Sequence, residues 1–204
     1  MLYSVFCVLI PEIIMKGKIF LLVGPSGSGK SSVFTELKKK YPKYTYPLSA
    51  TTRQKRKGEK DGDIYNFLSK EEFKKAIRED KFLEHAVVHQ DNYYGLIKEP
   101  VLESLVKGEI IVREVDIQGF DSIRDKIPEK NLVTIFITVP NKKELIERIV
   151  NRATIDDDEL NKRKESMHKE FARLKDCDYL VENIFGKLGE TVKKVSDIIK
   201  SEGK

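Results

Sequence analysis

A glycine-rich loop at residues 24–31 constrains this chain more than any other feature. The loop reads Gly-Pro-Ser-Gly-Ser-Gly-Lys-Ser, follows an apolar segment at 16–23, and precedes a segment, 31–40, whose apolar residues recur at helical spacing. A strand, such a loop and a helix in this order form a phosphate-binding unit. The glycines let successive backbone N–H groups converge on an anion, and the helix adds its positive end. We therefore expect Lys30 to contact the outer phosphates of a nucleoside triphosphate and Ser31 to ligate Mg²⁺.

The rest of the chain alternates segments that have strand and helix patterns. We expect strands over residues 44–49, 65–68, 82–89, 92–95, 109–115, 132–139 and 179–181. Helices are expected over 70–78, after a capping box at Ser69, and over 100–107, 141–152, 159–175 and a closing segment that ends near Lys200. This alternation predicts an α/β fold with a parallel sheet flanked by helices. Residues 49–96 contain mostly strands and loop, which predicts a lobe inserted into that core.

Composition narrows the class of protein. A chain of 204 residues fits one domain, with room for inserted lobes. The net charge is +5, but its 38 basic and 33 acidic residues are interleaved, which argues against a nucleic-acid surface. The two cysteines have no metal-binding spacing and suit a reducing compartment, so we expect a cytoplasmic protein. We expect neither nucleic acid nor a membrane among its partners.

The first fourteen residues stand apart from this plan. They are apolar, with Glu12 as their only charge, and they precede a second methionine, Met15. The segment has no basic start and no small-residue cleavage site, and it is too short to span a bilayer. We treat residues 1–15 as an N-terminal extension and expect translation to start naturally at Met15.

Arginine is the scarce cation of this chain, with nine arginines against 29 lysines. Five arginines gather in two places, Arg53 and Arg56 in a polar loop and Arg148, Arg152 and Arg163 around a polar break. The planar guanidinium suits bidentate phosphate binding, which a lysine does not reproduce. Together with the glycine-rich loop, the two groups indicate two phosphate-bearing substrates, or one phosphate chain held from both sides.

Several motifs together resemble the guanylate kinase family. In order along the chain they are GPSGSGKSS at 24–32, SATTRQKRKGEKDGDIYNF at 49–67, FLEHA at 82–86, NYYG at 92–95, EVDIQG at 114–119, the arginines at 148 and 152, and VEN at 181–183. The resemblance runs from Lys16 to the C-terminus. It implies a P-loop NTPase core formed by residues 16–48, 97–140 and 168–204, a GMP-binding lobe at 49–96 and a helical lid at 141–167.

The resemblance implies transfer of the γ-phosphoryl group of ATP to GMP, which gives ADP and GDP within purine nucleotide metabolism. On the ATP side it implies contacts from Gly24, Pro25, Ser26, Gly27, Ser28, Gly29, Lys30, Ser31, Ser32 and Asn183. Ser31 and Glu114 would serve Mg²⁺. Arg148, Arg152 and Arg163 would close over the transferring phosphoryl group. The implied partners are ATP, GMP and also dGMP, in a monomer or homodimer.

On the GMP side the resemblance implies two groups of residues. Arg53, Arg56, Tyr65 and Tyr94 would hold the GMP phosphate, with Glu59 orienting the arginines, and Ser49, Glu84 and Asp116 would contact the guanine. The chemistry of Glu84 supports its role, because one carboxylate can accept from the N1–H and N2–H groups of guanine. Adenine presents an acceptor at N1 and would be rejected. A general base is not required, because the attacking phosphate of GMP is already negative.

Two positions depart from the family pattern. Leu96 follows NYYG where the family usually has Ser or Thr, whose hydroxyl helps to read the base, so a hydrogen bond to guanine O6 is in doubt. Ala153 stands where a glycine usually follows Arg152, and this would stiffen the start of the lid.

Three alternatives remain at this point. A non-catalytic scaffold module with the same fold would bind phosphopeptides, but such modules typically lack an intact phosphate loop. A kinase for another phosphorylated acceptor, such as a ribose bisphosphate, would not need the guanine-reading residues Glu84 and Asp116. A nucleic-acid binder rests only on the net charge.

Overall fold

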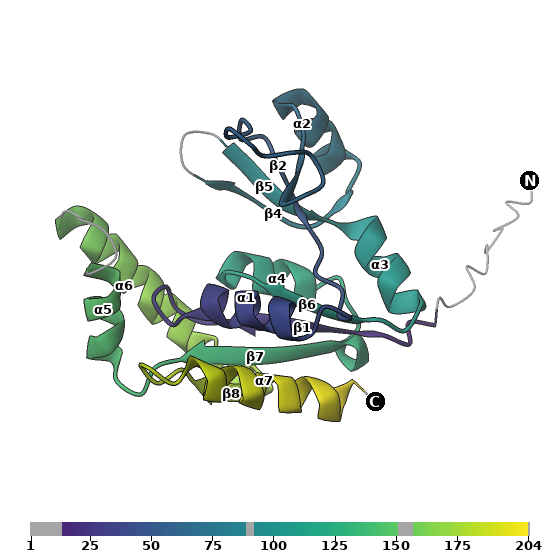
Figure 1. Cartoon of the computed structure of the whole chain (residues 1–204). Helices are drawn as coiled ribbons and strands as arrows, with labels where there is room; N and C mark the ends of the chain where they lie inside the picture. Colours follow the sequence, from purple (N-terminus) through teal and green to yellow (C-terminus); the bar gives the residue numbers. More distant parts are fainter. Residues whose placement is uncertain (1–13, 89–91, 151–156, 204) are drawn as a thin grey trace, which may run out of the picture.

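A parallel sheet forms the base of the molecule in the computed structural model, which describes residues 14–88, 92–150 and 157–203. Its strands lie in the order β6-β1-β7-β8, and every pairing is parallel (Figure 1). The strands are β1 (Lys18–Val23), β6 (Ile110–Glu114), β7 (Leu132–Thr138) and β8 (Tyr179–Glu182). The central position of β1 places the end of this strand, and the glycine-rich loop that follows it, in the middle of one edge of the sheet.

Helices cover both faces of this sheet because successive residues of a strand point to opposite sides. Ile19 and Leu21 of β1 pack in a cluster with residues of α3 (Lys98–Val106) and α4 (Ile117–Arg124). Phe20 and Leu22 pack in a second cluster with residues of α1 (Lys30–Lys40) and α7 (Leu188–Glu202). Two short 3₁₀ helices, Glu129–Asn131 and Leu174–Asp176, precede β7 and β8. The core is therefore a three-layer α/β arrangement.

A second, smaller sheet builds the inserted lobe. Its strands are β2 (Ser49–Thr51), β3 (Tyr65–Phe67), β4 (Phe82–Val88) and β5 (Asn92–Ile97), in the order β3-β2-β5-β4. The helix α2 (Lys70–Arg78) packs on it through Phe73, whose ring stacks on Phe82 at 4.3 Å. Ser69 and Glu72 form the predicted capping box at the start of α2. The lobe thus has a small aromatic core of its own.

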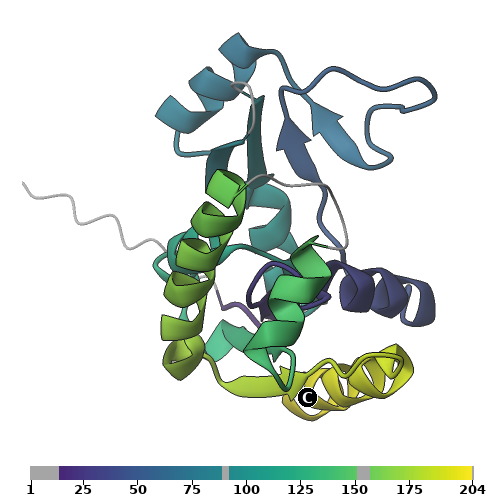
Figure 2. The same cartoon turned by 90° about the vertical axis from the view of Figure 1, so that its left-hand side faces the viewer.

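A pair of helices, α5 (Lys142–Val150) and α6 (Asp157–Ala172), follows β7. Both project from the end of the core at which the parallel strands finish, and α6 returns the chain to the core (Figures 1 and 2). Met167 of α6 packs with Val139 and Leu145, which anchors the pair to the core. The pair occupies the segment for which the resemblance implies a lid.

The fold class predicted from the sequence is confirmed, with two local differences. The strand predicted over 44–49 is reduced to an isolated bridge between Thr45 and Ile111, and β2 begins only at Ser49. The helix α4 was not predicted, because it has only eight residues, includes Gly119 and follows a strand directly. Its start is fixed by Asp116, whose side chain accepts a hydrogen bond from the Gly119 N–H. Within the described part of the chain, no helix has the length and apolar character that crossing a membrane would require.

Candidate active site

Two cavities adjoin at the carboxyl edge of the parallel sheet. The first, which we call the loop cavity, has a volume of about 520 Å³ and is lined by the glycine-rich loop, Arg148, Asn183 and Phe185. The second, the base cavity, has a volume of about 510 Å³ and is lined by residues of the core and of the lobe. Lys30 lines both cavities. A group that reacts near Lys30 can therefore be approached from two sides.

Two glycines of the loop have conformations that other residues would strain. Gly24 has a φ of 135°, and a Cβ there would lie 2.1 Å from the carbonyl oxygen of Ile137. Gly29 has a φ of 87° and is the N-cap of α1, and a Cβ there would lie 2.2 Å from Nδ2 of Asn183. Neighbouring segments thus approach the loop so closely that its path requires glycine. The shape of the loop is set by backbone and packing rather than by long side chains.

The ammonium group of Lys30 lies inside the loop. Its Nζ donates to the carbonyl oxygen of Gly24 and, at 3.2 Å, to that of Pro25. Burial lowers the pKa of Lys30, and the carboxylates of Glu170 and Glu114 oppose this shift. The two hydrogen bonds go to carbonyl oxygens, so a phosphate chain in the loop cavity would give this half-buried cation a directly bound anion.

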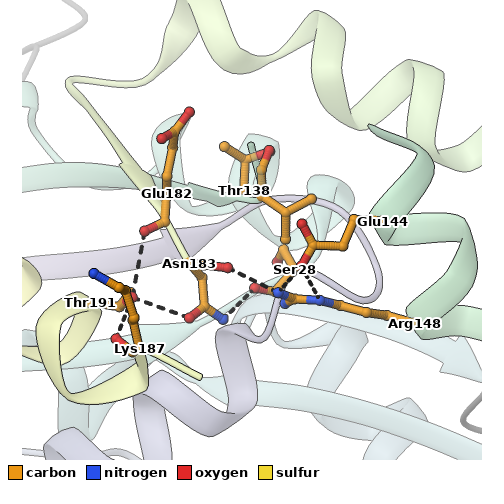
Figure 3. A network of polar contacts seen from close by, with 9 residues as sticks. Ser28, Thr138, Glu144, Arg148, Glu182, Asn183, Lys187 and Thr191 are labelled. Carbon is orange, nitrogen blue, oxygen red and sulfur yellow. Dashed lines mark hydrogen bonds and ion pairs between the residues drawn. The ribbon is translucent and has the colours of Figure 1, made fainter. Parts of the chain in front are cut away.

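A network of hydrogen bonds centred on Asn183 holds the loop from behind (Figure 3). The side-chain amide of Asn183 donates to the carbonyl oxygen of Ser28 at 2.8 Å and accepts from the Thr191 hydroxyl at 3.1 Å. Its backbone N–H donates to the carbonyl oxygen of Thr138 at 2.7 Å, and its backbone carbonyl oxygen accepts from Arg148 Nη2 at 3.1 Å. Asn183, which directly follows β8, therefore joins β7, α7 and α5 to the loop. A direct contact of this residue with the nucleotide stays a prediction.

A cluster of arginine, glutamate and tyrosine occupies the lobe side. Glu59 holds Arg53 through two hydrogen bonds, of 2.9 Å to Nη1 and 3.0 Å to Nη2, and accepts from the backbone N–H of Arg56 at 2.8 Å. The guanidinium of Arg53 also lies 5.3 Å from the ring centre of Tyr65, which meets Tyr94 edge to face. The hydrogen bond from Arg53 lowers the pKa of Glu59, with a further contribution from the Arg56 backbone. The structure thus brings Arg53, Glu59, Tyr65 and Tyr94 together, and Arg56 joins them through its backbone N–H. Their roles at the GMP phosphate stay predictions.

The base cavity gathers the residues predicted to contact guanine. Ser49, Glu84 and Asp116 all line it, and they come from β2, from β4 and from the start of α4. One carboxylate oxygen of Asp116 caps α4 through the Gly119 N–H at 2.8 Å. Burial raises the pKa of Glu84, which the neighbouring Arg113 opposes. The cavity therefore presents a carboxylate partly removed from water, as base recognition requires.

Comparison with known proteins identifies the family. The family model described as guanylate kinase matches residues 16–202. The guanylate kinase of Helicobacter pylori (strain ATCC 700392 / 26695) is 40% identical to this chain over 186 residues, which are 91% of this chain and 86% of that protein. The chain belongs to the guanylate kinase family. This confirms the resemblance seen in the motifs and the predicted class of nucleoside monophosphate kinase.

Two further members of the guanylate kinase family agree over similar lengths. The guanylate kinase of Clostridioides difficile (strain 630) is 39% identical over 189 residues, which are 93% of this chain and 90% of that protein. A crystal structure of guanylate kinase from Anaplasma phagocytophilum matches with a TM-score of 0.69 and 28% identity, and the match covers 93% of this chain and 87% of that one. The likeness thus includes the core, the lobe and the helical pair.

Of the three arginines predicted for the guanylate kinase lid, the structure describes the side chain of one. Arg148 lies on α5 beside the loop, where Glu144 and the carbonyl oxygen of Asn183 hold its guanidinium. Arg163 belongs to α6, but its side chain lies outside what the structure describes. Arg152 and Ala153 lie outside the described residues. Of the three, the structure brings Arg148 to the loop cavity, and the roles of the other two stay predictions.

The residues predicted for Mg²⁺ supply oxygen donors near the shared lysine. Ser31 lines the loop cavity, and Glu114, at the end of β6, lines the base cavity. Among the described residues, no three histidine, cysteine or acidic side chains gather as a metal site of their own. Mg²⁺ commonly binds through one or two protein oxygens and the phosphates of the substrate, so this small donor set fits the ion.

Two largely buried charged residues near the guanylate kinase site were not found from the sequence. Arg113 of β6 lines the base cavity, and Glu170 of α6 is 8% exposed, close to Lys30. Burial raises the pKa of Glu170, and Lys30 opposes the shift. A signal existed for Glu170, because it stands in an apolar helical stripe between Met167 and Phe171. The strand pattern around Arg113 carries no comparable signal.

Proposed function

We propose that this protein transfers the γ-phosphoryl group of ATP to GMP, giving ADP and GDP. The observation that carries the proposal is that two cavities with different chemistry share Lys30. The loop cavity offers the glycine-rich loop to a triphosphate, and the base cavity offers Glu84 to the N1–H and N2–H donors of guanine. Membership of the guanylate kinase family supports the same pair of substrates.

In the proposed reaction the protein aligns two phosphates and neutralises their charge. The loop and Lys30 hold the donor phosphates. Arg53, Arg56, Tyr65 and Tyr94 hold the phosphate of GMP, and Glu59 orients the arginines. No side chain has to remove a proton from the acceptor, because the attacking phosphate oxygen is already anionic at neutral pH. The same contacts would accept dGMP, because they involve the base and the phosphate, which the two nucleotides share.

Arg148 completes the donor side in this proposal. Its guanidinium lies at the wall of the loop cavity, where charge develops on the phosphoryl group during transfer. Ser31 and Glu114 would hold Mg²⁺ together with the nucleotide. When bound, this ion would neutralise charge on the phosphates and orient them. Arg152 and Arg163 are proposed to act with Arg148, as the family resemblance implies.

The experiment that tests the proposal measures ADP formation from ATP and Mg²⁺ with GMP, AMP, CMP, UMP or no acceptor. We expect turnover with GMP at least about 10²-fold above that with AMP, because the unpaired donors and acceptors of a wrong base remain buried. The absence of turnover with every nucleotide, together with retained GMP binding, would favour the non-catalytic scaffold module. Turnover with ribose 1,5-bisphosphate but not with GMP would favour the kinase for a sugar acceptor.

A further inference from the structure

Three neighbouring positions form a row across the lobe sheet at the wall of the base cavity. Leu96 of β5 pairs with Ser49 of β2 on one side and with Glu84 of β4 on the other. Residues directly opposite each other in a sheet point to the same face, so these three side chains are neighbours. Ser49 and Glu84 line the cavity, whereas Leu96 is fully buried in the hydrophobic core. The middle of the row therefore offers no polar atom to a base.

Arg113 reaches this row from the core sheet. Its Nη2 donates to the Ser49 hydroxyl at 2.5 Å and lies 3.6 Å from Oε1 of Glu84, while Nη1 donates to the carbonyl oxygen of Pro47 at 3.2 Å. The side chain is only 15% exposed, and that of Glu84 is 14% exposed. The guanidinium thus contacts both polar neighbours of Leu96. It brings a cation to the part of the row where Leu96 has no polar group.

The guanidinium of Arg113 also retains unused hydrogen-bonding capacity. Its Nε is buried and has no hydrogen-bond partner among the described residues. A buried donor without a partner is costly, and native proteins rarely keep one without a reason. Arg113 lines the base cavity, and its guanidinium has five N–H donors, so donors other than those paired with Ser49 and Pro47 are available to the acceptor atoms of a ligand.

We propose that Arg113 determines base specificity by donating to the O6 and N7 acceptors of guanine, beside Glu84, which accepts from N1–H and N2–H. The inference rests on the proposed function. O6 and N1 are on adjacent ring positions of guanine, which matches the 3.6 Å between Arg113 Nη2 and Glu84 Oε1. Arginine that donates to O6 and N7 is a common contact of guanine in protein–nucleic acid complexes. Adenine carries an amino group at position 6, so its donor would face the donors of Arg113.

The test pairs two variants with acceptors that change one edge of the base at a time. 6-Thio-GMP replaces O6 with sulfur, a weak acceptor, and IMP removes the 2-amino group but keeps O6. Steady-state kcat/KM is measured for GMP, 6-thio-GMP and IMP with the full chain and with Arg113→Met and Arg113→Lys. Arg124→Met is the control, because Arg124 is a half-exposed arginine of α4 with a weak ion pair to Asp176 at 3.9 Å. It lies outside both cavities.

We expect Arg113→Met to lower kcat/KM for GMP by about 10- to 100-fold, the range of a lost hydrogen bond to a charged group. The loss for 6-thio-GMP should be smaller than that for GMP, because its sulfur accepts weakly while N7 is unchanged, so that the preference for GMP over 6-thio-GMP narrows. The preference for GMP over IMP should persist, since Glu84 remains. Arg113→Lys keeps a charge beside Glu84 without the planar fork, and we expect it to lose part of the preference for GMP over 6-thio-GMP. It serves as the test if Arg113→Met does not fold.

The possible failures can be told apart. Equal losses for GMP and 6-thio-GMP would mean that Arg113 does not donate to O6. A change in the GMP-to-IMP ratio alone would mean that it acts only through Glu84. Either result overturns this inference and leaves the proposed function standing. No turnover of GMP by the unaltered protein would overturn the proposed function and this inference with it.

Discussion

The two cavities are built in opposite ways, although they share Lys30. The loop cavity is shaped mainly by backbone, because Gly24 and Gly29 have positive φ values and close neighbours, and because Asn183 fixes the loop from behind. The base cavity is shaped by side chains from five strands, β2 to β6, among them Glu84 and Arg113. Backbone N–H groups bind any phosphate, whereas paired side chains select one base. This difference in construction suits the loop cavity to binding the phosphates of a common phosphoryl donor. It suits the base cavity to selecting one particular nucleotide as the phosphoryl acceptor.

The electrostatics of the two sides follow the same division. In the base cavity a carboxylate and a guanidinium lie 3.6 Å apart, and both are largely buried. Such pairs contribute little net stability, because desolvation offsets much of their attraction. A bound base that leaves either buried charge unpaired, however, binds less favourably. In the loop cavity Lys30 donates hydrogen bonds to carbonyl oxygens of its own loop, and its positive charge can bind an anion there. We therefore expect changes in the loop cavity to act on turnover and ATP, and changes in the base cavity to act on the choice of base.

The largest effect is expected at Lys30. Lys30→Ala removes the charge that both cavities share and should lower kcat by about 10²-fold or more, because charge stabilisation dominates phosphoryl transfer. GMP binding should change little, since no contact of the lobe is removed. Steady-state kinetics and calorimetric titration with GMP measure the two quantities. Lys39→Ala, an exposed lysine of the same helix, is the control, and near-normal turnover of Lys30→Ala would refute the assignment of the loop.

The next effect concerns the choice of base. Glu84→Gln replaces an acceptor oxygen with an NH₂ donor that faces a donor of guanine, so kcat/KM for GMP should fall by about 10²-fold. The value for AMP should fall much less, and the preference between the two should narrow. Kinetic assays with both nucleotides measure this, with Glu103→Gln on the exposed face of α3 as the control. Equal losses for GMP and AMP would show that Glu84 is structural.

The loop side of this comparison was largely predictable from sequence, because its determinants are local. The strand, the loop at 24–31 and the helix α1 follow one another within 23 residues, 18–40, and glycine spacing reports the turn directly. The capping box at Ser69 was predictable for the same reason. The position of Asn183 behind the loop was not, because its hydrogen bond to Ser28 spans 155 residues.

The base side was less accessible to sequence reasoning. Glu84 could be proposed from a motif, but Arg113 enters the cavity only because β6 lies beside the lobe, and the residue pattern of one strand does not report such an arrangement. Glu170 was missed because charged residues on helices usually face water, whereas this one is buried near Lys30. A site made of side chains from separate elements depends on the tertiary fold.

A smaller effect is expected at Asn183, whose hydrogen bonds hold the glycine-rich loop and which we call the loop brace. Its variant should show whether these bonds affect ATP binding separately from the stability of the whole protein. Asn183→Ala removes the hydrogen bonds to Ser28 and Thr191, so we expect a KM for ATP about tenfold higher and a nearly unchanged KM for GMP. The free energy of unfolding should fall by about 1–3 kcal/mol, because buried partners lose their hydrogen bonds.

Asn131→Ala is the matched control for this variant. Asn131 is equally buried and donates to the carbonyl oxygens of Met15 and Gly17, before β1 and far from the loop along the strand. It should lose similar stability without a change in the KM for ATP. An increase in that KM for both variants would mean that the effect follows lost stability rather than the brace.

The smallest effects should appear as pH is varied, and the two cavities should respond at opposite ends of the range. Burial raises the pKa of Glu84, and GMP binds the ionised form, so kcat/KM for GMP should fall severalfold on the acid side, beginning above the pH at which an exposed carboxylate titrates. Burial lowers the pKa of Lys30, and ATP needs the charged form, so kcat/KM for ATP should fall on the alkaline side, beginning below the pH at which a free lysine titrates. Comparison with Glu84→Gln separates the acid limb from protonation of the GMP phosphate, which titrates for both proteins. If the acid limb for GMP persists unchanged in Glu84→Gln, the carboxylate does not control acceptor binding, and the proposed contrast between the cavities loses its electrostatic basis.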